Sequence, residues 1–154
     1  MRAVVQRVAR AHVDVEGSTV GQIERGLLIL IGCGRGDTAQ EAQWLSEKIA
    51  GLRVFENEAG KMDLNVIDIG GSLLIVSQFT LYGDITRGRR PSFDGALAKV
   101  EARALYETFV ELCRAHAPVQ TGIFEAHMTV HLLNDGPVTL ILDTPDRLEP
   151  GSST

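Results

Sequence analysis

The chain has 154 residues, of which 44% are hydrophobic and 23% charged, and its formal net charge is −5. This length suits one domain with a sizeable core, and the acidic balance argues against a broad nucleic-acid-binding surface. No apolar run approaches the ~20 residues needed to cross a bilayer, so no membrane association is expected. Two cysteines without metal-like spacing favour a reducing cytoplasmic location over a disulfide-bonded secreted protein.

The N-terminal third predicts a meander of short strands, because apolar and β-branched runs alternate with glycine-containing turns. The glycine-rich stretch at 32–36 lacks the Lys-Ser/Thr of a phosphate loop and the spacing of a dinucleotide loop, so we interpret it as a flexible loop. Thr38 and Glu41 then form a capping-box pattern at the start of a helix that Gly51 ends. The strands are expected at residues 2–8, 11–16, 20–24, 27–31 and, after this helix, 52–55.

The second half of the chain predicts one long helix and two closing strands. Apolar residues recur at helical spacing over about 93–116. The strands are expected at 123–133 and 138–143, joined by Asn-Asp-Gly-Pro, an unusual turn because its proline opens the following strand. The predicted organisation is one α/β domain over 1–144 and a flexible C-terminal tail over 145–154.

The sequence changes abruptly from apolar to polar after residue 76. An apolar run at 73–76, typical of a strand buried on both faces, is followed by Ser77, Gln78 and Thr80 around Phe79. Unpaired polar groups are costly to bury, so these side chains need partners. Strand alternation would place Ser77 and Phe79 on one face and Gln78 and Thr80 on the other. A strand that simply runs into a turn, with its polar groups satisfied by nearby backbone, explains the stretch equally well.

Two loops carry groups that suit charged ligands. Arg87, Arg89 and Arg90 cluster in one turn, and guanidinium groups match phosphate oxygens; a solvated basic turn is the simpler interpretation. The Gly136–Pro137 bond, if cis, would hold two carbonyls nearly parallel, an arrangement that could bind an ammonium group. A trans proline that stiffens the loop is the commoner case.

The histidines suggest no catalytic pair and no metal site. His12, His116, His127 and His131 are not spaced to pair with a candidate nucleophile. His127 and His131 are four apart, which is metal-like only on a helix, and this segment is predicted to be a strand. We therefore expect a core or surface role for each histidine, and no cofactor or metal.

The sequence Ser-Gln-Phe-Thr at 77–80, followed far downstream by Asn-Asp-Gly-Pro-Val-Thr at 134–139, resembles the D-aminoacyl-tRNA deacylase family, the type once called D-tyrosyl-tRNA deacylase. The similarity also covers the Met-Arg-Ala-Val-Val-Gln-Arg-Val start, Gly-Arg-Arg-Pro-Ser-Phe at 88–93 and Thr-Gly-Ile-Phe at 121–124. There are two departures from the family pattern. Glu125 stands where glycine is expected, and Asp-Leu-Asn at 63–65 where Asn-x-Ser is expected, which puts substrate preference in question.

The resemblance implies a mixed, mainly antiparallel barrel-like sheet with two main helices, and a homodimer in which the Gly136–Pro137 loop enters the partner's pocket. The substrate would be the 3′ acceptor end of D-aminoacyl-tRNA, and also glycyl-tRNA, including glycine mischarged on tRNA-Ala. Aminoacyl esters are activated, so positioning and oxyanion stabilisation matter more than a strong nucleophile. A non-catalytic RNA-binding module on the same fold is the alternative.

The implied roles divide into five groups. Thr80 and then Ser77 are the hydroxyls nearest the chemistry, with Gln78 as an orienting group and Phe79 packed near the adenosine. Backbone N–H groups around Phe79 and Thr80 would stabilise the oxyanion while water attacks. Carbonyls of the Gly136–Pro137 loop would fix the α-ammonium and so exclude L-amino acids. The remaining residues are Phe124 and Met128 as apolar walls, and Arg87, Arg89 and Arg90 as contacts to acceptor-stem phosphates.

Overall fold

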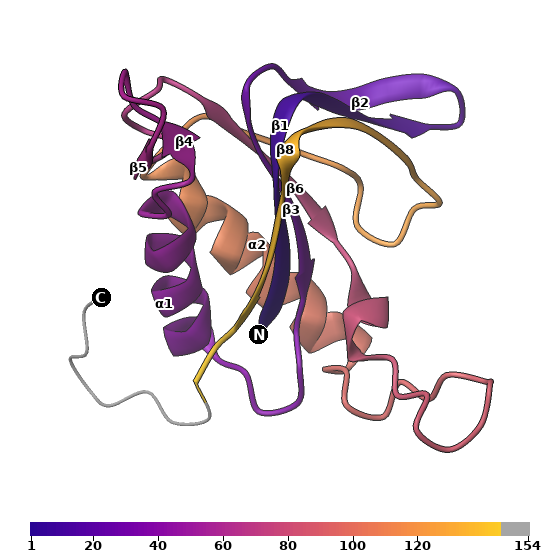
Figure 1. Ribbon diagram of the computed structural model, residues 1–154. Coiled ribbons are helices and arrows are strands. Elements are labelled where there is room, and N and C mark those ends of the chain that lie inside the picture. Colours follow the sequence, from indigo (N-terminus) through magenta and orange to yellow (C-terminus); the bar gives the residue numbers. More distant parts are fainter. Residues whose placement is uncertain (146–154) are drawn as a thin grey trace.

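Strand β1 (Arg2–Val15) organises the sheet in the computed structural model, which describes residues 1–145. One edge of β1 pairs antiparallel with β3 (Gly26–Gly32) through its first half and with β2 (Ser18–Ile23) through its second half. Its other edge pairs antiparallel with β8 (Thr129–Asp143) over nearly its whole length (Figure 1). Two strands were predicted where β1 runs unbroken, because β8 continues to pair across the expected gap.

Strand β8 is also one element rather than the predicted hairpin, and residues 123–128 lie outside it. Asn134 pairs with Val8 while Thr139 pairs with Gln6, so the intervening residues of β8 bulge out of the ladder. This bulge contains the Gly136–Pro137 bond, which is cis. The Asn-Asp-Gly-Pro segment therefore interrupts one strand instead of reversing the chain.

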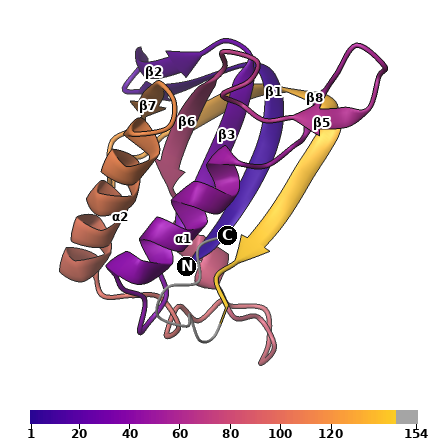
Figure 2. The same ribbon diagram turned by 90° about the vertical axis from the view of Figure 1, so that its left-hand side faces the viewer.

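Helices α1 (Ala39–Ala50) and α2 (Lys99–Arg114) cover one face of the sheet (Figure 2). The capping box of Thr38 and Glu41 is present, as predicted. Helix α2 begins at Lys99 rather than near residue 93, because the backbone before it bonds to another loop. The Arg35 N–H donates to the Gly95 carbonyl at 2.9 Å, and the Leu97 N–H to the Cys33 carbonyl at 3.0 Å.

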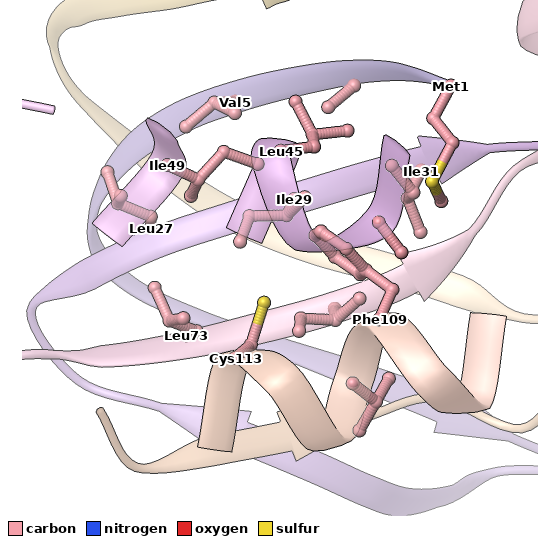
Figure 3. Packing of buried hydrophobic residues seen from close by; sticks show 14 of the residues in the cluster. Met1, Val5, Leu27, Ile29, Ile31, Leu45, Ile49, Leu73, Phe109 and Cys113 are labelled. Carbon is pink, nitrogen blue, oxygen red and sulfur yellow. The ribbon is translucent and has the colours of Figure 1, made fainter. Parts of the chain in front are cut away.

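Strands β3 and β6 (Ser72–Ser77) run parallel and carry the core on both faces. Toward the helices, Ile29 and Leu73 pack with Leu45 of α1 and Phe109 of α2 (Figure 3). The burial of residues 73–76 on both faces is thus confirmed. The opposite face carries a second buried cluster of Val8, Ala11, Val13, Ile23, Leu28, Leu74 and Val76.

The hairpin of β1 and β2 curls over this second cluster, so that β2 approaches β7 (Val119–Thr121), the strand parallel to β6. At Gly21 of β2 an added Cβ would lie 2.3 Å from the Thr121 carbonyl oxygen, which leaves room only for glycine. The sheet is therefore barrel-like, and the predicted fold class is confirmed: one mixed α/β domain with two main helices.

The remaining elements are short. Strands β4 (Phe55–Glu56) and β5 (Met62–Leu64) form a separate two-stranded sheet, so only the end of the strand predicted at 52–55 exists. A 3₁₀-helix, η1 (Phe79–Tyr82), follows β6. The predicted tail lies outside the described residues from position 146 onward. Within residues 1–145 no helix is both long and apolar enough to span a membrane.

Candidate active site

A cavity of about 570 Å³ opens where β6 ends. Its volume falls in the range typical of small-molecule sites. The walls come from the end of β6, the start of α2 and the segment before β8. The residues that line it are Cys33, Val76, Ser77, Gln78, Phe79, Ala96, Leu97, Lys99, Ala102, Phe124, Glu125, Ala126, His127, Met128 and Val130.

Ser77, Gln78 and Phe79 all face this one cavity. Strand alternation predicted two opposite faces, but alternation ends at Ser77 because η1 begins at Phe79 and tightens the backbone. The Gln78 N–H still donates to the Ile31 carbonyl at 2.8 Å, which holds the turn beside β3. The change from strand to 3₁₀-helix therefore gathers the predicted residues.

Thr80 lies at the rim and is exposed, outside the cavity lining. Its hydroxyl accepts a short hydrogen bond from the Gln78 side-chain amide. The N–H groups of Phe79 and Thr80 stand at the start of η1, where a helix leaves its first donors without internal partners. Across residues 1–145 neither N–H finds a backbone acceptor. The turn thus presents two adjacent donors beside a hydroxyl.

The predicted apolar walls, Phe124 and Met128, both line the cavity. The Phe124 ring lies 5.6 Å from the Tyr106 ring, and the Arg103 guanidinium lies 5.3 Å from its centroid. The buried Tyr106 hydroxyl donates to the Ile75 carbonyl at 3.1 Å. Phe124 thus packs on α2, whose Tyr106 is in turn bonded to β6.

An ion pair at the cavity rim was not anticipated from the sequence. Lys99 Nζ lies 2.9 Å from Glu125 Oε2, and both residues line the cavity. Glu125 has φ of +67°, a left-handed conformation that favours glycine. This backbone explains why the family pattern leads one to expect glycine there. The other departure, at 63–65, does not line the cavity.

The Gly136–Pro137 loop does not reach this cavity within one chain. Strand β8 is separated from β6 by β1 and β3, and the loop lies beside Arg7, near the opposite end of the sheet from Ser77. With neighbouring strands about 4.8 Å apart and about 3.3 Å of rise per residue, the two lie roughly 20 Å apart. A single protomer thus brings together only part of the predicted site.

A buried guanidinium anchors that loop, and sequence analysis assigned it no role. Arg7 Nε donates to the Asp135 carbonyl at 2.8 Å, and Nη1 donates to the Val54 carbonyl at 2.6 Å. Asn134 also braces the bulge, because its Oδ1 accepts from the Val138 N–H at 2.7 Å. The available signal was an arginine at the position where β1 alternation turns a side chain into the core, as with Val5.

Arg87, Arg89 and Arg90 occupy an exposed loop that projects away from the sheet between η1 and α2 (Figure 1). The base of the loop is closed by mutual backbone hydrogen bonds between Asp84 and Ser92, at 2.7 and 2.9 Å. The Phe93 ring packs edge-to-face on Phe79 at 5.0 Å. This contact places the basic loop beside the cavity.

The fold and the cavity together define an α/β domain with a half-enclosed pocket. Within residues 1–145 the Thr80 hydroxyl beside the pocket has no hydrogen bond to a histidine or carboxylate that would make it a nucleophile. Residues 4–143 match the family model described as D-Tyr-tRNA(Tyr) deacylase. The chain belongs to this family, and the resemblance inferred from the two motifs is confirmed.

Two relatives carry the deacylase name, and two solved structures share the fold. The chain is 58% identical over 148 residues to a D-aminoacyl-tRNA deacylase of Geobacter sulfurreducens, covering 96% of this chain and 97% of the relative. It is 59% identical over 145 residues to one of Thermotoga petrophila, covering 94% and 97%. A solved structure titled c-Myc DNA Unwinding Element Binding Protein superposes with a TM-score of 0.90 at 42% identity, covering 94% of this chain and 99% of the other. A probable eukaryotic D-amino acid tRNA deacylase gives 0.78 at 20% identity, covering 92% and 97%, which shows the fold alone.

Replacing Arg7 with methionine should lower the free energy of unfolding by about 2–3 kcal/mol, because the Val54 and Asp135 carbonyls would lose charged donors. Urea unfolding at fixed protein concentration measures this. The matched control is Arg10→Met, an exposed position on the same strand, expected within about 0.5 kcal/mol of the parent. Equal effects of the two substitutions would show that Arg7 does not anchor the loop.

Cys33 should not behave as a nucleophile although it lines the cavity. Burial, reinforced by the Asp37 carboxylate, raises the pKa of its thiol to about 12. The thiol is therefore neutral at pH 7.5, with on the order of one thiolate in ten thousand or fewer. Iodoacetamide should leave Cys33 unmodified in the native protein by mass spectrometry and modify it in urea. Rapid native alkylation would contradict this assignment.

Proposed function

We propose that this chain hydrolyses the ester bond between a D-amino acid and the 3′-terminal adenosine of tRNA, releasing the free D-amino acid and tRNA. The observation that carries the proposal is the turn at 77–80, which presents adjacent backbone donors and a hydroxyl beside a cavity of substrate size. A domain over 1–144 acting on aminoacyl-tRNA would work in the cytoplasm.

The chemistry follows from what the turn offers. Water attacks the ester carbonyl, and the N–H groups of Phe79 and Thr80 stabilise the developing oxyanion, an effect worth about 10²–10³ in rate per donor. Gln78 holds the Thr80 hydroxyl in place through its amide. The terminal 2′-OH of the substrate itself assists proton transfer, as the family resemblance implies, so that Ser77 and Thr80 position the substrate and form no acyl intermediate.

The second half of the site comes from another copy of the chain. Within one protomer the Gly136–Pro137 loop lies roughly 20 Å from Ser77 by strand spacing. The same strand exposes Leu133 by 50% and Ile141 by 71%, which suits a face covered in a homodimer. In that dimer the partner's Gly136–Pro137 loop closes the cavity.

The selectivity for D- over L-amino acids follows from the closed site. Carbonyl oxygens of the Gly136–Pro137 loop fix the α-ammonium, and the turn at Thr80 fixes the reacting carbonyl, so the other two substituents on Cα have set directions. A backbone wall then occupies the place of an L side chain, while a D side chain points outward. Gly136 itself admits no side chain, since an added Cβ would lie 2.8 Å from the Val138 nitrogen. A filter that works by exclusion lets glycine pass.

The decisive assay is parallel deacylation of D-tyrosyl-, L-tyrosyl- and glycyl-tRNA by the purified, metal-free protein. The D-ester should be lost rapidly, the glycyl ester more slowly, and the L-ester should persist, because only the L side chain meets the backbone wall. Thr80→Val serves as a matched variant that removes the hydroxyl with little change in volume. Equal loss of the L- and D-esters would refute the filter, and no hydrolysis at all would favour an RNA-binding module.

The basic loop should make tRNA binding depend on salt. Affinity falls as salt rises, and three phosphate contacts by Arg87, Arg89 and Arg90 should make the slope of log affinity against log salt steeper by about 2–3. Replacing all three with glutamine should remove that part of the slope in filter-binding or fluorescence titrations. Arg114→Gln, at the far end of α2, is the control that should leave the slope unchanged. A flat response in the parent protein would exclude the phosphate role.

A further inference from the structure

Three potential metal ligands meet on the face of β1 that points away from the buried second cluster. His12 and Asp14 are two apart on β1, and His131 of β8 pairs directly opposite His12. Neighbouring residues Ala11 and Val13 point into the buried cluster, so alternation turns these three side chains outward together. Spacing along the chain gave no sign of this, because the two histidines are joined by strand pairing.

The geometry converges on one carboxylate oxygen. Asp14 Oδ2 lies 3.2 Å from Nε2 of His131 and 3.7 Å from Nε2 of His12. The two imidazole rings are stacked, with centroids 4.2 Å apart and planes inclined by 11°. One ligand atom from each of the three residues lies within 4.8 Å of the others. Ligand atoms around a tetrahedral ion bound at 2.0–2.1 Å stand about 3.3 Å apart. To close the site, the ligand atoms must draw together and the two stacked rings must tilt toward each other, so that both nitrogen lone pairs point at one ion.

A fourth residue, Thr19, orients the Asp14 carboxylate. Thr19, on β2, donates its hydroxyl proton to Oδ1 of Asp14 at 2.7 Å. This bond occupies the oxygen that points away from the histidines and leaves Oδ2 directed at both rings. Groups that orient a ligand in this way are a regular part of protein metal sites.

We propose that His12, Asp14 and His131 bind a divalent transition-metal ion of the zinc class, with water in the remaining position. Two imidazoles and one carboxylate are a donor set that Zn²⁺ accepts. The proposal does not rest on the hydrolytic function, because none of the three residues lines the cavity. An ion here would clamp the start of β8 to β1, directly after Met128 in the cavity wall, and so would act as a structural staple.

The test is titration of metal-free protein with Zn²⁺ by calorimetry and with Co²⁺ by absorption spectroscopy. We expect one ion per chain, tetrahedral Co²⁺ bands, and selective shifts of the His12 and His131 proton resonances on adding Zn²⁺. His131→Ala and Asp14→Asn should each weaken binding at least tenfold. Thr19→Val should weaken it about tenfold, because Asp14 loses its orienting bond.

His116→Ala is the matched control and should bind as the parent does, since His116 lies at the end of α2. Circular dichroism of each metal-free variant checks that it is folded, and the resonance shifts in the parent protein need no variant. Absence of binding in the parent would overturn the proposal. Binding of equal strength in the His12→Ala/His131→Ala double variant, or shifts confined to other histidines, would overturn it as well.

Discussion

A strand buried on both faces must stay apolar at every buried position, and β6 obeys this constraint from Leu73 to Val76. The helices occupy one side of it and the curled hairpin of β1 and β2 the other (Figures 1 and 2). Polar side chains can be accommodated only where neither the helices nor the hairpin covers the strand any longer. The cavity opens at this point, and the 3₁₀-turn that follows places backbone donors at its rim. The position of the candidate site is thus a consequence of how the core is covered.

The proposed site relies on main-chain groups where many hydrolases use side chains, and this proposal accounts for its architecture. Backbone donors and carbonyls have fixed directions only if the segments that carry them are held firmly. Gln78 is held to β3 by its N–H, and the bulge of β8 is held by Arg7 and Asn134. The buried guanidinium is costly to desolvate, and its two carbonyl partners offset that cost. Arg7 thereby ties the bulge of β8 to β1 and to the backbone at Val54.

Local patterns predicted the local features well. The capping box gave the start of α1, and the abrupt change after Val76 marks where the cavity opens. Features made by distant pairing were missed, because nothing near Val8 in sequence shows that pairing with β8 will keep β1 continuous across the expected break. The same limit hid Arg7 beside Asp135 and His12 beside His131, each pair more than one hundred residues apart. Helix α2 was overextended because periodicity does not reveal that Gly95 bonds to a loop near residue 35.

Glu125 shows how one departure from a family pattern is accommodated. A non-glycine residue in the left-handed region costs on the order of 1–2 kcal/mol, and its exposed ion pair with Lys99 returns about 0–1 kcal/mol. Stability therefore does not account for the glutamate. Unpaired, its carboxylate would repel the phosphates of a nucleic-acid substrate at the cavity rim. Lys99 cancels that charge, so the rim gains a bulky side chain without becoming anionic, and the effect of Glu125 falls on the shape of the pocket.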